Sequence, residues 1–216
     1  MRALAVVALL LWGGRSGFGA NKPTGEARTW PNELTREAIK GMEGRSTPRA
    51  RHDATLPFTR MLAGHADYTP VHFGERRNDT TWAHQVATAA VFTSPLLTYG
   101  AQPKTMLENP CAEMIKSIPS VWDETVVLPV SEIGEIAAFA RRRGNDWFLA
   151  VLNGTQVRSA RIPLSFLGAG VYLGLLVRDS DEGPAAVRIE KTKLGREQSL
   201  RIDLRDGGGF VGRFSK

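Results

Sequence analysis

The spacing of apolar and polar residues changes character near Trp122, which divides the chain into a mixed first part and a β-rich second part. In the first part, apolar residues recur at helical spacing over 81–92, and Asp79 or Thr80 is expected to cap this helix. Ser94-Pro95 would end it, because proline has no backbone N–H to continue the helical hydrogen bonds. We therefore predict one well-formed helix directly upstream of this pair.

A second helix is predicted over 109–118. Pro110 would stand in its first turn, where the missing N–H does no harm, and Pro119 would end the helix. The stretches rich in Pro and Gly between the two helices are expected to be loops.

From Glu124 onward the pattern consists of short β-type runs separated by turn residues such as Asn153-Gly154. Three arginines at 141–143 stand before Gly144 and indicate a hairpin tip. Several short strands with regular turn signals predict an antiparallel β-sandwich. The predicted strands are 125–130, 135–141, 147–152, 158–164, 170–178, 186–190, 199–204 and 209–214.

Composition and charge change this picture little. Hydrophobic residues make up 42% and charged residues 23% of the chain, which is ordinary for a globular protein. The net charge of +6 invites a nucleic-acid interpretation, yet Lys and Arg are scattered and no RNA-binding or zinc signature is present. The single cysteine, Cys111, excludes an internal disulfide. We expect no nucleic-acid partner.

The N-terminus starts with Met1-Arg2, and an apolar run follows over 3–12. This is typical of a signal-peptide core, and it is too short for the ~20 residues that cross a bilayer. The stretch 17–20 could serve as a cleavage site. Two alternatives stay open: non-native sequence read from an upstream start codon, and a buried strand. No stable membrane span is expected.

Acidic and aromatic residues gather over 30–43. Glu37 and Glu43 lie too far apart in sequence to stack on one helix face, where neighbours recur every three or four residues. A break at Gly41 would let the two carboxylates converge. Further polar groups at 51–53, 67–70 and 72–75 are expected at segment ends. This composition is typical of a sugar-binding cleft, and the alternative is an ordinary solvated surface.

Six segments, in collinear order, resemble the C-terminal half of glycoside hydrolase family 97. They are 19–33, 56–60, 67–70, 93–96, 121–125 and 207–210. Members of this family are bacterial enzymes that act on α-glucosides and α-galactosides. The resemblance begins at Gly19 and runs to the C-terminus.

The resemblance also implies a fold. Family members carry a large N-terminal β-sandwich, a (β/α)₈ barrel and a small C-terminal β-domain, and a complete barrel needs ~250 residues, more than the 216 of this chain. The implied fold class is α/β plus all-β, with a partial (β/α)₈ barrel remnant followed by a C-terminal antiparallel β-sandwich. The expected divisions are a signal-like or non-native segment 1–18, barrel residues 19–122 and the β-sandwich 123–216.

The resemblance assigns roles to the two glutamates. Glu43 matches the general acid, or acid/base, and both Glu37 and Glu43 match carboxylates that hold Ca²⁺, a cation that prefers oxygen ligands. The alternative for Glu43 is a loop carboxylate paired with Arg45 or Arg49.

The resemblance also points to the retaining branch. Inverting members carry a His-Glu pair where this chain has Phe18-Gly19, whereas members with glycine there resemble the retaining branch, whose nucleophile is an aspartate on an earlier barrel strand. That strand is not found in this sequence, so we assign no nucleophile. We expect the chain by itself to be inactive or nearly so, and we assign the nucleophile to neither Asp53 nor Asp67.

The histidines match no zinc spacing. His52 and His72 are candidate sugar contacts, together with Asp67 at an expected strand end, whereas His84 is expected to be structural. The sequence therefore predicts a truncated α-glycosidase that is periplasmic or secreted and acts on an α-glycoside or oligosaccharide. The alternatives are a non-catalytic β-sandwich that binds carbohydrate or forms homo-oligomers, and a remnant without independent function.

Overall fold

The computed structural model describes residues 39–42, 49–62 and 64–216. Its strands are β1 (Glu124–Val127), β2 (Ile136–Arg143), β3 (Asp146–Asn153), β4 (Arg158–Pro163), β5 (Val171–Ser180), β6 (Gly183–Gly195), β7 (Ser199–Leu204) and β8 (Gly209–Ser215). Six of them form one antiparallel sheet in the order β1-β2-β3-β8-β5-β6, and β4 pairs with β7 in a second, two-stranded sheet.

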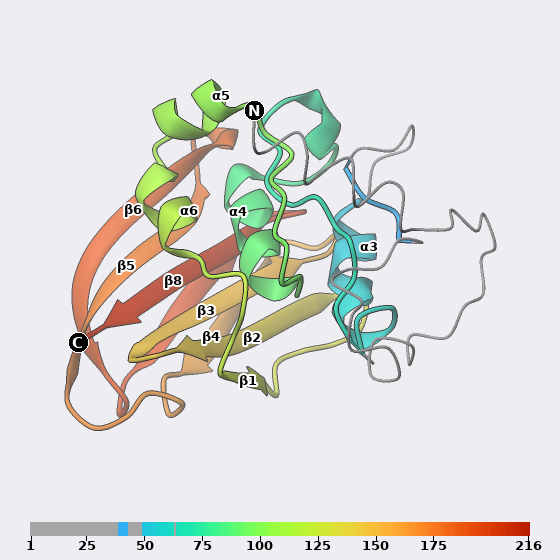
Figure 1. Cartoon of the computed structure of the whole chain (residues 1–216). Helices are drawn as coiled ribbons and strands as arrows, with labels where there is room; N and C mark the ends of the chain where they lie inside the picture. Colours follow the sequence, from blue (N-terminus) through green and yellow to red (C-terminus); the bar gives the residue numbers. More distant parts are fainter. Residues whose placement is uncertain (1–38, 43–48, 63) are drawn as a thin grey trace, which may run out of the picture.

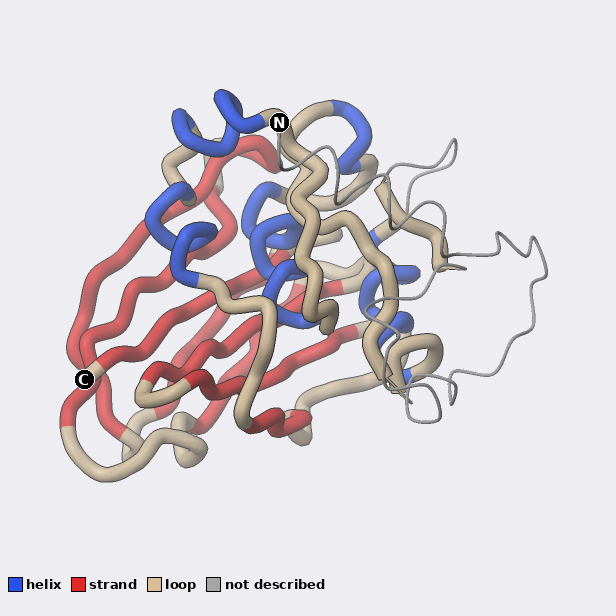
Figure 2. Tube along the Cα trace, in the orientation of Figure 1, coloured by secondary structure: helices blue, strands red, loops and turns tan. Residues whose placement is uncertain are grey.

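The helices all precede the strands in sequence. They are α3 (Ala50–Thr55), α4 (Trp82–Val91), α5 (Pro103–Glu108) and α6 (Ala112–Ser117), with 3₁₀ turns η1 (Leu56–Phe58) and η2 (Glu75–Arg77). Figure 1 shows these helices on one face of the large sheet, with the small sheet on the other. Figure 2 shows the same layers by colour, with helices and loops on one side of the strands.

Each face of the large sheet buries its own core. Alternate residues of β3 point to opposite faces, so Leu149 packs toward the small sheet while Phe148 packs toward the helices. The small sheet contributes Ile162 and Ile202 to the core between the two sheets. This packing of one sheet on another confirms the predicted antiparallel β-sandwich.

The helix side is one continuous core shared by both parts of the chain. Val86 and Ala90 of α4 pack in the same cluster as Ala137, Phe148 and Val211 from the strands. No strand is present among the described residues ahead of Glu124, so the partial barrel stays a prediction, as does the division near residue 122.

The predicted helix boundaries need correction. Thr81, not Asp79 or Thr80, caps α4, and its hydroxyl accepts a hydrogen bond from the backbone N–H of His84 at 3.1 Å. Asp79 instead accepts from the N–H of Ala50 at 3.0 Å and so caps α3, a helix that the sequence did not predict.

The second predicted helix starts later than expected, at Ala112, because the side chain of Asn109 accepts from the N–H of Cys111 at 2.9 Å and forms a turn first. Helix α5 was also missed. All eight predicted strands are present, and β6 is longer than predicted. Gly144 adopts a φ of 58° at the β2–β3 hairpin, which confirms the predicted tip.

Candidate functional site

The short strip 39–42 is the described part of the acidic segment. Met42 is buried in the helix-side core, and its carbonyl oxygen accepts a hydrogen bond from Nη1 of Arg76 at 3.0 Å. Ile39 packs against the same core. Glu37 and Glu43 flank this strip and lie outside the described residues, as do Arg45 and the N-terminal segment. The chain that links the two glutamates is therefore anchored to the fold.

His52 lies on α3, next to this strip. Its ring forms a hydrogen bond with the backbone of Lys40, and its Nε2 is buried without a hydrogen-bond partner. Burial lowers the pKa of His52 below its usual value, the nearby Asp53 opposes this change, and the charge of Lys40 adds to it. Because the hydrogen bond with Lys40 favours the protonated ring, the ring is its donor, and in the neutral imidazole Nε2 is then an acceptor for a hydroxyl group.

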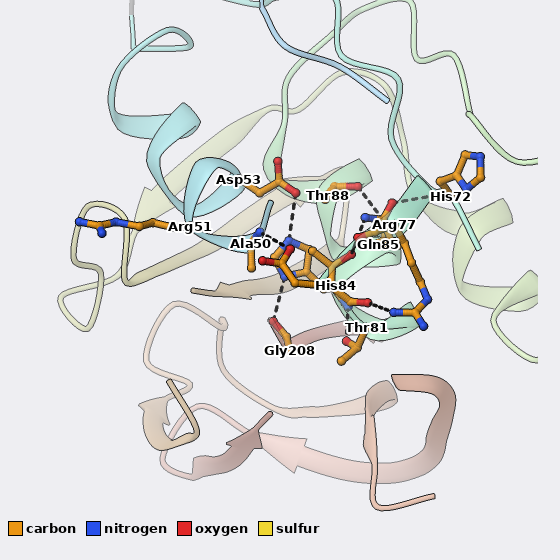
Figure 3. Close-up of polar contacts among 12 residues, drawn as sticks. Ala50, Arg51, Asp53, His72, Arg77, Thr81, His84, Gln85, Thr88 and Gly208 are labelled. Carbon is orange, nitrogen blue, oxygen red and sulfur yellow. Dashed lines mark hydrogen bonds and ion pairs between the residues drawn. The ribbon is translucent and has the colours of Figure 1, made fainter. Parts of the chain in front are cut away.

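His72 lies near Arg76. Its backbone N–H donates to the side-chain oxygen of Gln85 at 2.9 Å, as drawn in Figure 3, and its Nδ1 accepts from the N–H of Gly74 at 3.2 Å. Burial lowers the pKa of His72, and the charge of Arg76 lowers it further. Because Nδ1 is an acceptor, the neutral ring carries its proton on Nε2.

The residue before His72 is in a strained backbone conformation. Val71 is fully buried with a φ of 65°, a region that β-branched residues rarely adopt. Such strain costs about 1–3 kcal/mol and persists where the surrounding structure fixes the backbone. Here the carbonyl of Pro70 accepts from the N–H of Gly100 at 2.8 Å, and Gln85 holds the following residue. The backbone at His72 is thus held in place at an energetic cost.

Asp67 is half-buried and lies in the loop between Ala66 and Tyr68. The N–H of Ala66 donates to the carbonyl of Thr93 at 3.2 Å, and Tyr68 is buried, so both neighbours of Asp67 are fixed. No strand is assigned at Asp67, so its expected position at the end of a barrel strand stays a prediction, like the barrel itself.

A buried polar network lies beneath these residues (Figure 3). Nε2 of His84 lies 3.2 Å from Oδ2 of Asp53, and its Nδ1 lies 3.0 Å from the carbonyl oxygen of Gly208. The hydroxyl of Tyr68 donates to Oδ1 of Asp53 at 3.1 Å. The side chains of Asp53 and His84 are both fully buried, so their polar atoms rely on these partners for hydrogen bonds.

This network joins α3 and α4 to the β-domain. Asp53 and His52 are neighbours on α3, so fixing the buried aspartate also fixes the histidine that touches Lys40. His84 is a structural residue, as the sequence predicted. The arrangement of Asp53 and Tyr68 was missed, because nothing in the local sequence shows that residues so far apart in the chain meet.

The glycine turn 207–209 completes the connection. The N–H of Thr81 donates to the carbonyl of Gly207 at 2.9 Å, and a Cβ added at Gly209 would overlap the backbone of His84. Asp179 accepts from the hydroxyl of Thr81 at 2.6 Å and from the N–H of Gly209 at 3.1 Å. Glycine is required here because the start of α4 lies directly against the turn.

The described residues contain no group of three or more His, Cys, Asp or Glu that could hold a metal ion. Within the same residues, no helix is long and apolar enough to cross a membrane. The structure brings His52 and Arg76 into contact with the strip 39–42, and His72 lies near Arg76.

Comparison with known proteins agrees with this architecture. Residues 121–215 match a family described as "Glycosyl-hydrolase 97 C-terminal, oligomerisation". The chain is 30% identical over 214 residues to a retaining alpha-galactosidase of Bacteroides thetaiotaomicron, and the match covers 89% of this chain and 32% of that protein.

Solved structures show the same relationship. A glycoside hydrolase family 97 enzyme from Pseudoalteromonas sp. strain K8, in complex with panose, superposes with a TM-score of 0.82 at 32% identity, over 90% of this chain and 33% of that one. A beta-arabinopyranosidase, 22% identical with a TM-score of 0.71 over 85% of this chain and 31% of its own, shares the fold.

Residues 121–215 therefore match the C-terminal region of glycoside hydrolase family 97, and most of the chain is similar to members of that family, which confirms the resemblance found in the sequence. It spans about a third of the length of the relatives it matches.

Proposed function

We propose that this chain is the C-terminal part of a retaining α-glycosidase, and that it supplies Glu43 as the acid/base group. The supporting observation is the anchored strip 39–42, which leads from Glu37 to Glu43 and is held by His52 and Arg76. The match to a retaining alpha-galactosidase makes α-galactosides the first substrate class, followed by α-glucosides.

The chemistry needs two carboxyl groups. In a retaining mechanism a carboxylic acid protonates the leaving oxygen while a carboxylate attacks the sugar carbon, and the first group then deprotonates the incoming water. Glu43 fits the first role. No residue of this chain is assigned as the nucleophile.

His52, His72 and Asp67 are proposed to contact sugar hydroxyl groups. Both histidines have a lowered pKa and are neutral at neutral pH, so each can exchange hydrogen bonds with a hydroxyl without adding charge. The N–H on Nε2 of His72 would be a donor, because its Nδ1 is already occupied by Gly74.

A calcium ion held by Glu37 and Glu43 is part of the proposal. It would supply a hard cation that binds a sugar hydroxyl. The described residues offer no cluster that completes such a site. A periplasmic or secreted location is proposed from the signal-like N-terminal run.

A chimera tests the proposed role of Glu43. The C-terminal third of the B. thetaiotaomicron relative is replaced by this chain from residue 19, and turnover is measured on an aryl α-galactoside. We expect activity that falls at least about 100-fold in Glu43→Gln, since acid/base groups contribute 10²–10⁴-fold. Added azide, which needs no general base, should restore turnover and give an α-galactosyl azide.

Glu33→Gln is the matched control, because it removes another carboxylate of the same segment and should leave turnover within about twofold. A folded, active chimera that tolerates Glu43→Gln would disprove the assignment. A β-configured azide product would disprove the retaining acid/base role.

A second candidate function is self-association through the β-domain, which the description of the matched family includes. Strand β6 is an edge strand of 13 residues, and Val171, Leu173 and Ile189 nearby are exposed apolar side chains. Unpaired edges and apolar surfaces of this kind favour a second copy. Light scattering should show a dimer or larger species that Leu173→Lys dissociates, whereas a monomer at all concentrations would refute it.

A further inference from the structure

A pocket lies where the end of α4 meets the outer edge of the large sheet. It has a volume of about 240 Å³ and its walls are mainly apolar. The residues that line it are Pro57, Met61, Leu62, Val91, Thr93, Thr125, Val127, Phe139 and Arg141. Leu62 and Val127 are exposed, so the pocket is open to solvent at its rim.

Arg141 is the one charged side chain among the residues that line this pocket, and it is only 5% exposed. Its Nη2 donates to the carbonyl oxygen of Val91 at 2.8 Å, at the C-terminus of α4. Its Nε and Nη1 are buried and have no hydrogen-bond partner. A guanidinium group carries five N–H donors, so most of its capacity is unused.

The surroundings do not neutralise this charge. The guanidinium lies 5.3 Å from the centre of the Phe139 ring and 5.8 Å from that of Trp122. No ion pair among the described residues includes Arg141. Burial lowers its pKa to about 10, so the group still carries its positive charge at neutral pH. A buried cation with free donors and an open apolar pocket is suited to an anion.

Arg178, in the same sheet, is a buried arginine that has a carboxylate partner. It is 8% exposed, its Nε donates to a carboxylate oxygen of Glu190 at 3.1 Å, and its Nη1 donates to the carbonyl of Arg201 at 2.9 Å. It too lies over an aromatic ring, that of Phe210, at 5.2 Å. The two arginines differ in the carboxylate, which Arg178 has and Arg141 lacks.

We propose that this pocket binds a small organic carboxylate, whose anionic end pairs with the free N–H groups of Arg141 and whose apolar body packs on Phe139 and Met61. The volume is below the ~300–1,000 Å³ of sites for drug-sized ligands, which restricts the occupant to a small monocarboxylate. The site is separate from the strip 39–42 and does not depend on glycosidase activity.

Calorimetric titration of the 216-residue chain with benzoate tests the site. We expect saturable binding of one benzoate per chain, at least about tenfold tighter than that of benzamide, which has nearly the same shape without the charge. Sodium sulfate should not displace benzoate, because it has no apolar body. Equal binding of benzoate and benzamide, or no benzoate binding at millimolar concentrations, would refute the proposal.

Thr125 offers a variant that fills the site from within. It lies directly opposite Arg141 in the β1–β2 register and lines the pocket. Thr125→Glu should place a carboxylate beside the guanidinium, raise the melting temperature and weaken benzoate binding at least about tenfold. Thr125→Gln, the uncharged control, should neither raise the melting temperature nor weaken benzoate binding. Because Thr125 is exposed on an edge strand, both variants are expected to fold.

Arg141→Met should abolish benzoate binding, whereas Glu190→Gln, which removes the carboxylate partner of Arg178, should leave it unchanged. If Arg141→Met does not fold, the comparison of Thr125→Glu with Thr125→Gln tests the proposal instead. Benzoate binding that survives in a folded Thr125→Glu variant would overturn the proposal. So would binding of an acidic peptide by a chain that does not bind benzoate, because the occupant would then be a polypeptide.

Discussion

The helical part of the molecule and the β-domain obtain their order in different ways. Strands such as β7, with strictly alternating exposed and buried residues, are paired along their whole length. The helices contain six to ten residues, below the ~12–15 at which isolated helices become stable. The helical part therefore owes its order to the sheet, through the core packing of α4 and the contacts of Asp53, His84 and Gly208.

The largest expected effect comes from breaking the buried network that joins the two parts. His84→Leu leaves Oδ2 of Asp53 and the carbonyl oxygen of Gly208 buried without this hydrogen-bond partner, which costs about 1–3 kcal/mol of unfolding free energy for each group. Urea unfolding measures this loss. Proteolysis should then cut the helical part first, while the β-domain resists.

A double variant measures the interaction of Asp53 with His84 separately from the packing of each side chain. Asp53→Asn with His84→Leu should be less destabilising than the sum of the single changes, by about 0.5–3 kcal/mol. Strict additivity would contradict the coupling seen in the structure.

The glycine turn should show the next effect. Gly207 has a φ of 59°, and a Cβ there would overlap the carbonyl of Asp79. Gly144 has a φ of 58° with open space around it, and serves as the control for backbone conformation alone. We expect Gly144→Ala to cost about 1–2 kcal/mol and Gly207→Ala about 1–3 kcal/mol more, measured by thermal unfolding. Equal losses would show that the backbone at Asp79 moves away from the turn freely.

Asp179 should give a smaller, pH-dependent effect. Burial raises the pKa of its carboxyl, although hydrogen bonds from Thr81, Arg205 and Gly209 oppose the shift. In the unfolded chain the group ionises at its ordinary pKa of 3.8. Its contribution to stability is therefore greatest below that pH and is lost as the pH rises through the folded-state pKa.

Asp179→Asn removes this dependence, so the unfolding free energy of the variant should fall less steeply than that of the native chain as the pH rises above 4. An identical slope in both proteins would contradict the raised pKa. Asp203→Asn, which alters an exposed carboxyl of β7 with a lowered pKa, should change the slope in the opposite direction.

The smallest effect is expected at His52. Its pKa is lowered mainly by burial, so folding favours the neutral ring; this stability is present above the ordinary pKa of 6.5 and is lost as the pH falls through the folded-state pKa. The protection factors of the amides in α3, which correct the exchange rates for their intrinsic pH dependence, should fall on acidification. His52→Gln should reduce that change. A proton NMR titration giving a pKa at or above 6.5 would refute the lowered value.

The sequence predicted the β-domain better than the helical part. Alternation and turn residues are local signals, so all eight strands were predicted near their actual positions. The position of Arg141 could not be predicted, because three consecutive arginines suggest an exposed tip, and only the sheet shows that the first of them points under α4. The Asp53–His84 contact could not be predicted either, because its members are 31 residues apart in the sequence.

The candidate site was predicted only in part. The sequence named His52 and His72, and the structure places His52 against the strip 39–42 and His72 near Arg76, which contacts that strip. It gave no sign of α3 or of the strained Val71, because both depend on contacts with distant segments. Roles for Glu37 and Glu43 rest on family resemblance, and they stay predictions.

The position of β8 has a consequence for how this protein is made. This strand is the last in sequence, yet it lies in the middle of the large sheet, between β3 and β5. Until the ribosome has released it, the sheet exists as two separate halves with exposed apolar edges, and chaperones would meet that species. A chain that stops near residue 208 would therefore leave those halves permanently unjoined, because it lacks β8.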